Sequence, residues 1–143
     1  MKLFTIGFTR TSAEHFFARL QAAGVKTVID VRLNNVSQLA GFAKKDDLRY
    51  FARAICGAGY VHLPELAPTP EMLKAYRAGK DGWAAYARAF RGLMARRRVE
   101  RLDRAPFDGG CLLCSEAAPH HCHRRLVAEY LREKWGDVEI EHL

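Results

Sequence analysis

Short apolar runs alternate with amphipathic stretches along the chain, and the two patterns predict different elements. Five runs are too short for helices and rich in apolar residues, which predicts strands at 2–7, 26–31, 60–63, 111–114 and 138–143. Apolar residues at helical spacing predict helices from 11 or 12 to 23, from 46 or 47 to 56 and over 123–135, with two more between 71 and 102 and a break at 79–82. The order of these elements predicts an α/β fold.

The alternation of strands and helices also predicts how the sheet is built. Parallel strands need long crossover connections, which the predicted helices supply. We therefore expect residues 1–143 to form a single domain, with a mainly parallel five-stranded sheet and helices on both faces, in a Rossmann-like three-layer sandwich. The carboxyl ends of such strands share one edge, so residues 7–10, 30–32, 62–65 and 114–116 should converge there.

Composition says more about the class of binding partner than it says about the fold. The formal net charge of +7 favours an anionic small molecule or a nucleic acid as partner. Part of the excess lies in an arginine-rich stretch between Arg88 and Arg104, which is typical of a solvated outer face. No stretch approaches the roughly 20 apolar residues of a membrane span. We therefore expect a cytoplasmic protein without membrane contact, in which the thiols stay reduced.

The segment from Cys111 to Arg125 concentrates reactive side chains. It holds three of the four cysteines and three of the six histidines, together with Glu116 and Arg124. A predicted strand ends and a predicted helix begins within it, so these polar groups gather where a strand passes into a helix. Ligands of open α/β sheets bind at that position.

Asp30 and Arg32 close an apolar strand, where charges are costly unless they meet a partner or a ligand. Two positions apart on a strand, they should point to the same side of the sheet. Two interpretations stay open. The pair either forms a mutual or loop-anchoring ion pair, or the arginine holds a substrate anion while the aspartate orients it or binds a hydroxyl.

Cys114 stands where the fourth strand should end, and Glu116 follows two positions later. Three roles stay open for the Cys114 thiol: a small buried residue, a nucleophile activated by nearby positive charge, or a metal ligand. Cys122 is a second candidate nucleophile. A carboxylate beside a pocket can act as a general acid or base, which is the role we expect of Glu116, with a helix cap or salt bridge as the alternative.

His123 and Arg124 fall in the first turn of the last long predicted helix. Free backbone N–H groups and the helix dipole attract anions to such a turn, and an arginine adds charge-assisted hydrogen bonds. Both residues are therefore candidates for binding a phosphate or a carboxylate.

Other polar residues are expected at the same edge. Asn34 and Asn35, followed by Ser37 and Gln38, form a loop after the second strand that either makes turns or contacts a substrate. Thr9 follows the first strand and is a further candidate for substrate binding.

No cofactor is predicted, and a structural zinc ion is the alternative to test. Cys111 and Cys114 are separated by an odd number of positions, so on an extended strand their side chains point to opposite faces. A full four-ligand site is therefore disfavoured. The remaining partial set consists of Cys114, Cys122 and one of His120, His121 or His123.

These residues form motifs that resemble the domain-of-unknown-function family 488, a set of small prokaryotic proteins. The motifs are Thr5-Ile6-Gly7, Ile29-Asp30-Val31-Arg32, Leu113-Cys114-Ser115-Glu116 and Cys122-His123-Arg124. The resemblance spans nearly the whole chain and implies an α/β fold and shared motif positions, but no reaction. Many members carry His-Ser after the first motif, where this chain has Phe8-Thr9, so a proton-transferring histidine is absent from that place.

The leading functional hypothesis is an enzyme, a hydrolase or group transferase, that acts on a phosphate-bearing ligand such as a nucleotide or a nucleic-acid end. Arg32 and Arg124 would hold the anion, Glu116 and Asp30 would handle protons or hydroxyls, and either cysteine would be an optional nucleophile. Two alternatives remain: a non-catalytic module that binds nucleic acid or nucleotides, and a protein with a structural zinc site in residues 111–122.

Overall fold

The structure, a computed structural model, describes residues 1–36, 40–79 and 82–143. Each predicted strand is present, with bounds that differ by a residue or two at the ends. The strands are β1 (Lys2–Gly7), β2 (Thr27–Asp30), β3 (Gly59–His62), β4 (Gly110–Cys114) and β5 (Glu139–His142). Every pair is parallel, and the strand order is β3-β2-β4-β1-β5, which confirms the predicted α/β class and sharpens "mainly parallel" to fully parallel.

The fourth strand, β4, occupies the centre of the sheet between β1 and β2. Its last residue, Cys114, pairs with Gly7 of β1, and Leu113 pairs with Asp30 of β2. The three strand ends that carry the predicted site residues are therefore neighbours, although they lie far apart in the sequence.

The helices agree closely with the expected ones. They are α1 (Ala13–Ala23), α2 (Lys45–Cys56), α3 (Pro70–Arg77), α4 (Trp83–Arg97) and α5 (His123–Trp135). The Ser12 side chain caps α1 by accepting from the backbone N–H of His15, and Gly24 ends the helix in a left-handed conformation. In the described part of the chain, no helix has the length and apolarity that crossing a bilayer requires.

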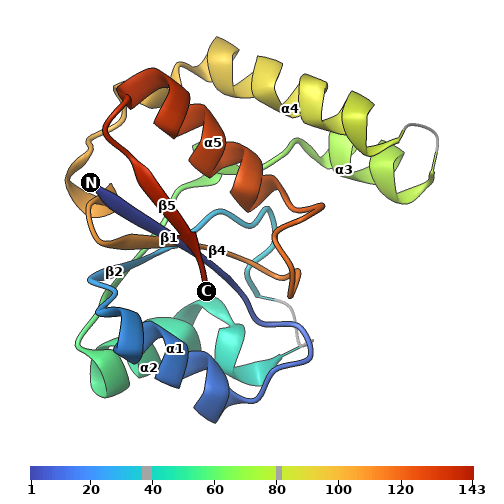
Figure 1. Ribbon diagram of the computed structural model, residues 1–143. Coiled ribbons are helices and arrows are strands. Elements are labelled where there is room, and N and C mark those ends of the chain that lie inside the picture. The colour runs from blue at the N-terminus through green and yellow to red at the C-terminus, as the bar shows by residue number, and fades with distance from the viewer. Residues whose placement is uncertain (37–39, 80–81) are drawn as a thin grey trace.

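The helices cover both faces of the sheet, as predicted. Figure 1 shows α1 and α2 together on one side and α4 and α5 on the other, with α3 next to α4. Each side has its own cluster of buried apolar residues. Phe16, Phe17 and Leu20 belong to the cluster under α1 and α2, whereas Phe90, Leu126 and Leu131 belong to the cluster under α4 and α5.

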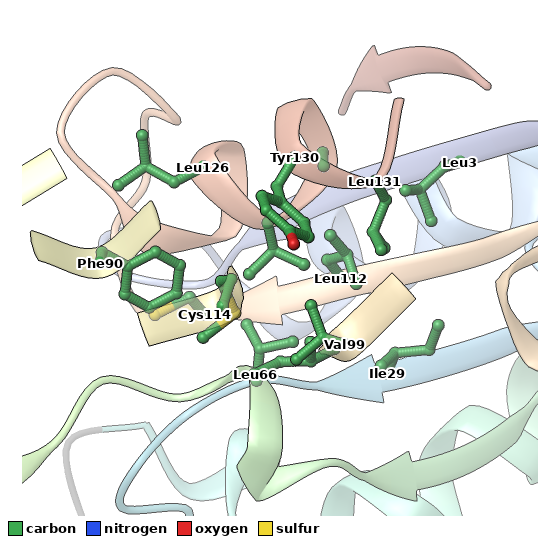
Figure 2. Packing of buried hydrophobic residues seen from close by; sticks show 14 of the residues in the cluster. Leu3, Ile29, Leu66, Phe90, Val99, Leu112, Cys114, Leu126, Tyr130 and Leu131 are labelled. Atoms are coloured by element: carbon green, nitrogen blue, oxygen red, sulfur yellow. The ribbon is translucent and has the colours of Figure 1, made fainter. Parts of the chain in front are cut away.

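Side chains of β4 alternate between these two clusters. Cys111 and Leu113 pack in the cluster under α1 and α2, while Leu112 and Cys114 pack in the other. Figure 2 shows Cys114 among the buried side chains of this second cluster. The expectation that Cys111 and Cys114 point to opposite faces is confirmed.

Candidate functional site

A pocket of about 420 Å³ lies at the carboxyl edge of the sheet. It is bordered by the segments that follow β1, β2 and β4, by α3 and α4, and by the start of α5. Its lining includes Phe8, Arg32, Asn34, Tyr76, Arg77, Trp83, Tyr86, Cys114, Glu116, His121, Cys122 and His123. The predicted convergence therefore occurs for the residues that follow β1, β2 and β4, whereas no residue of 62–65 lines this pocket. The cavity has the size that small ligands occupy, roughly 300–1,000 Å³.

Asp30 and Arg32 form the mutual ion pair that the sequence left open. Nε of Arg32 donates to Oδ1 of Asp30 at 2.9 Å, and Nη2 donates to Oδ2 at 2.8 Å. Tyr60 donates its hydroxyl to the same carboxylate, which is fully buried and does not line the pocket. Burial of the Tyr60 hydroxyl itself raises its pKa, and the hydrogen bond to Asp30 adds to the effect. Asp30 thus holds the Arg32 guanidinium in place from outside the pocket.

Arg32 reaches the pocket while it is paired. Its Nη2 also donates to the carbonyl oxygen of Ala43 at 2.7 Å, and its guanidinium lies 5.2 Å from the ring centre of Phe8. Among the described residues, no acceptor is hydrogen-bonded to Nη1. One edge of an immobilised guanidinium therefore remains for a ligand, so the ion pair and the anion-binding interpretation are compatible.

Two sulfur atoms and one ring nitrogen that could bind a metal ion lie together in the pocket that Arg32 also lines. The ligand atoms of Cys114, Cys122 and His123 all lie within 4.8 Å of one another, and all three residues are buried and line the pocket. Cys114 ends β4, Cys122 precedes the first turn of α5, and His123 begins that helix. The junction of strand and helix brings together the partial metal-ligand set that the sequence suggested.

The His123 ring is oriented by a backbone carbonyl. Its Nε2 lies 2.7 Å from the carbonyl oxygen of Val31, just after β2. Because a carbonyl can only accept, Nε2 carries the hydrogen, and Nδ1 presents its lone pair. Nδ1 lies 3.7 Å from Sγ of Cys114. The ring therefore directs a metal-binding or proton-accepting nitrogen at the sulfur.

The two thiols of the cluster differ in acidity. The pKa of Cys114 is lowered, chiefly because the Cys122 thiol donates a hydrogen bond to its sulfur, and the N–H of Ser115 adds a second. The same contact, together with burial, raises the pKa of Cys122. Cys111 on the other face has its pKa raised by burial. Cys114 is thus the sulfur of this segment that is prepared to carry negative charge.

Arg124 is placed differently from the expectation of an anion-binding residue. It is fully buried and does not line the pocket. Its guanidinium donates to the carbonyl oxygens of Glu116 and Ala117 and to Oγ1 of Thr5. These contacts tie the segment after β4 to β1, so Arg124 supports the pocket from outside it.

The end of β1 meets the same segment closely. A Cβ on Gly7 would lie 1.7 Å from the carbonyl oxygen of Glu116, so only glycine allows this approach. Thr9, a predicted substrate-binding residue, donates its hydroxyl to the carbonyl of Ser115, which also accepts from the Thr9 N–H at 2.9 Å. Thr9 therefore supports the loop and is not among the lining residues.

The remaining predicted residues divide between the pocket and its surroundings. Glu116 and Asn34 are exposed and line the pocket. Asn35 is buried behind it, where its side chain contacts the hydroxyl of Tyr60 and its carbonyl accepts from the N–H of Lys45. Ser37 and Gln38 lie outside the described residues.

An aromatic wall on the far side of the pocket did not follow from the sequence. It consists of Tyr76 from α3, Trp83 and Tyr86 from α4, and His121 from the segment before α5. Their spacing in α3 and α4 indicates amphipathic helices and nothing more. Only the tertiary structure, in which this helix pair meets the carboxyl edge of the sheet, makes their rings part of the site.

The arginine-rich stretch lies on the outer surface, as expected, and several of its side chains have partners within the molecule. Arg91 forms an ion pair with Glu133, Arg104 pairs with Asp137, and Arg97 donates to two backbone carbonyls. Arg88, Arg96, Arg98 and Arg101 are exposed, and within the described residues no ion pair engages them.

The fold and the pocket define a parallel α/β protein with a Cys-Cys-His cluster at the carboxyl edge of its sheet. A family model described as "Domain of unknown function DUF488" matches residues 12–131, and the chain belongs to this family. Comparison with the curated proteins and with the solved structures found no match. Membership of this family assigns no reaction to the chain, so its function has to be inferred from the site.

Proposed function

We propose that the protein is a metal-dependent enzyme, a hydrolase or group transferase, that acts on a phosphate-bearing ligand in this pocket. The observation that carries the proposal is the cluster of Cys114, Cys122 and His123, which lines the same cavity as Arg32. One part of the site suits a metal ion, and the other suits an anion.

One distance within the cluster suits a tetrahedral ion. Zinc bonds of about 2.3 Å to sulfur and 2.0–2.1 Å to nitrogen separate neighbouring ligand atoms by roughly 3.5–3.8 Å. The distance of 3.7 Å between Sγ of Cys114 and Nδ1 of His123 falls in that range. The carbonyl of Val31 on the opposite ring nitrogen supplies the outer hydrogen bond that metal-binding histidines usually have.

The number of ligands favours a catalytic ion over a structural one. Structural zinc sites have four protein ligands, whereas catalytic sites have three and leave one position for water or substrate. In the ranges that the structure describes, the group contains three members. Because all three line the pocket, a ligand in the pocket can take the fourth position.

Charge balance points to a divalent ion. Metal binding would deprotonate both thiols, and two thiolates with one neutral imidazole carry a charge of −2, which a divalent ion balances. Sulfur and imidazole ligands together select zinc or a similar transition metal over magnesium or calcium.

The residues of the chain have distinct roles in this proposal. Cys114, Cys122 and His123 would hold the ion, which would supply Lewis-acid chemistry to the pocket. Arg32 binds the phosphate through Nη1, while Asp30 holds the guanidinium in place. As the water oxygen bonds to phosphorus, Glu116 accepts its proton. The bond from phosphorus to the leaving oxygen then breaks, and Glu116 returns the proton to that oxygen.

Metal analysis of protein purified under reducing conditions tests the proposal first. We expect about one zinc-class ion per chain, lost in Cys114→Ser and Cys122→Ser and retained in Cys56→Ser, because Cys56 is a half-buried thiol of α2 outside the cluster. Cobalt substitution should add the absorption of a thiolate–cobalt bond. A folded protein that takes up neither ion contradicts the metal site.

Hydrolysis of a chromogenic phosphate diester then tests the reaction. We expect activity that a chelator removes and zinc restores, with a loss of about 100-fold or more in Glu116→Gln. Glu14→Gln is the matched control, since Glu14 is an exposed carboxylate of α1 on the opposite face. Equal losses in the two variants, or activity that persists without metal, would count against the assigned roles.

One contact favours a second candidate, a thiol-dependent transferase that works without metal. His123 points Nδ1 at Sγ of Cys114, which is the arrangement of a nucleophile and its base. In that case the metal-free protein would be active, and alkylation of Cys114 would abolish its activity. The chelation experiment separates the two candidates directly.

A further inference from the structure

The aromatic wall is shaped to receive a planar ring. The rings of Tyr76 and Tyr86 lie 4.9 Å apart, and that of Trp83 lies 5.8 Å and 5.4 Å from them. The exposed imidazole of His121 stacks on Trp83 at 4.9 Å with an interplanar angle of 20°. The indole thus already holds a flat heteroaromatic ring at the pocket.

Burial separates the structural part of this wall from the accessible part. Tyr86 is 6% exposed and belongs to the core under α4 and α5, where it supports the other rings. Tyr76 and Trp83 remain half-buried although they line the pocket. Their accessible ring area is apolar surface that a stacked ligand would remove from water.

The other side of the same pocket is suited to an anion. Arg32 is buried and fixed by Asp30 and by the carbonyl of Ala43, so the Nη1 edge of its guanidinium is already oriented for binding. Arg77 lies exposed at the rim. A ring site, an anion site and the Cys-Cys-His cluster therefore share one cavity of about 420 Å³.

We infer that the substrate is a free nucleotide, with its phosphate between Arg32 and the cluster. Its base lies against the Trp83 ring and meets Tyr76 at an edge, because those two rings are inclined at 65° to each other. This inference rests on the proposed function and deepens it, because a phosphate ester alone would leave the aromatic wall unused. We favour a free nucleotide over a nucleic-acid end because the ring surface, the anion site and the cluster share one cavity of about 420 Å³, which is the size of a small-ligand site.

Trp83 makes the inference directly measurable. The chain has two tryptophans, and Trp135 packs against Phe107 and donates to the carbonyl of Glu100, away from the pocket lining. In the zinc-loaded Trp135→Phe variant, emission therefore reports Trp83 alone. We expect AMP to quench this emission and ribose 5-phosphate to leave it unchanged.

Affinity gives the second readout. Stacking of a base on an aromatic side chain corresponds to about 5- to 150-fold in affinity, so AMP should bind tighter than ribose 5-phosphate by a factor in that range. Trp83→Leu should reduce AMP binding to the level of ribose 5-phosphate and leave the latter unchanged. Tyr50→Leu is the matched control, because Tyr50 is an exposed aromatic residue of α2.

If Trp83→Leu fails to fold, His121→Ala tests the same wall from an exposed position, with a smaller loss of AMP affinity expected.

The outcomes separate this inference from the proposed function. Equal affinity for AMP and ribose 5-phosphate, with no quenching, would overturn the base site and leave a phosphate-binding enzyme. Tighter binding of a 5′-phosphorylated oligonucleotide than of AMP would overturn it in favour of a nucleic-acid end. If AMP, ribose 5-phosphate and inorganic phosphate all fail to bind, the proposed function fails together with the inference.

Discussion

Two hollows of similar size lie on this molecule, and their linings differ in kind. The groove between α1 and α2 has a volume of about 380 Å³, and Phe17, Phe51 and Ile55 are among its walls. The pocket at the strand ends has a volume of about 420 Å³ and combines sulfur, imidazole, guanidinium and carboxylate groups with aromatic rings. Volume therefore does not distinguish a candidate active site here. Position does, because one hollow lies at the carboxyl ends of parallel strands and the other between two helices.

The central strand, β4, explains why cysteine and histidine side chains line only one of the two hollows. Alternation along β4 sends Cys111 into the cluster under α1 and α2, where its neighbours are apolar, and sends Cys114 toward Cys122 and His123. The first thiol is a packing residue, and the second belongs to the Cys-Cys-His cluster. Substitutions that act on one hollow should therefore leave the other unchanged.

The largest expected effect is on stability, at the groove. Phe17 is 3% exposed and packs against the rings of Phe16, Phe42 and Phe51. Phe17→Ala should lower the free energy of unfolding by about 3–5 kcal/mol, measured by urea denaturation. Leu73→Ala in the half-buried pocket wall should lower it by less than about 1 kcal/mol, since that side chain remains partly in water. Equal losses would remove the distinction between a structural groove and an open pocket.

The next effect concerns the charges at the pocket. Arg32→Leu leaves the buried carboxylate of Asp30 without its cation, which should lower the free energy of unfolding by about 3 kcal/mol. We expect Asp30→Asn combined with Arg32→Leu to recover part of this loss, because no isolated charge remains. If the double variant is less stable than Arg32→Leu, the ion pair is not the reason for the effect.

The sequence predicted the elements well and the contacts of the site less completely. Hydrophobic periodicity and cap residues such as Ser12 and Gly24 are local signals, so the helices and strands followed from them. The place of β4 between β1 and β2 depends on long-range pairing that no local pattern encodes. For the same reason Arg124, which resembled an anion ligand in sequence, instead donates to the carbonyls of Glu116 and Ala117.

A smaller effect distinguishes the two cysteines of β4. Cys111→Ser places a hydroxyl in a fully buried apolar environment, which should lower the free energy of unfolding by about 1–3 kcal/mol while metal content is kept. Cys114→Ser should change stability less in the metal-free protein, because His123 and Cys122 offer hydrogen-bond partners, but it should abolish metal binding. Calorimetry and metal analysis of both variants measure this contrast. It fails if Cys111→Ser loses the metal as well.

The smallest expected effect is a pH dependence on the face that carries α5. His142 of β5 contacts Oγ1 of Thr5 through Nδ1 at 2.7 Å, and Thr5 also accepts from Arg124. Partial burial lowers the pKa of His142 below its ordinary value of 6.5, and the positive charge of Arg124 lowers it further. The unfolded chain therefore binds a proton at His142 more readily than the folded one. The contribution of His142 to stability is complete above pH 6.5 and declines as the pH falls from there toward the lowered pKa.

The unfolding midpoint of His142→Gln should consequently fall less between pH 7.5 and pH 5.5 than that of the unmodified protein. His15→Gln, which changes an exposed histidine of α1, should keep the original slope. If both variants retain that slope, the Thr5–His142 contact does not couple protonation to folding.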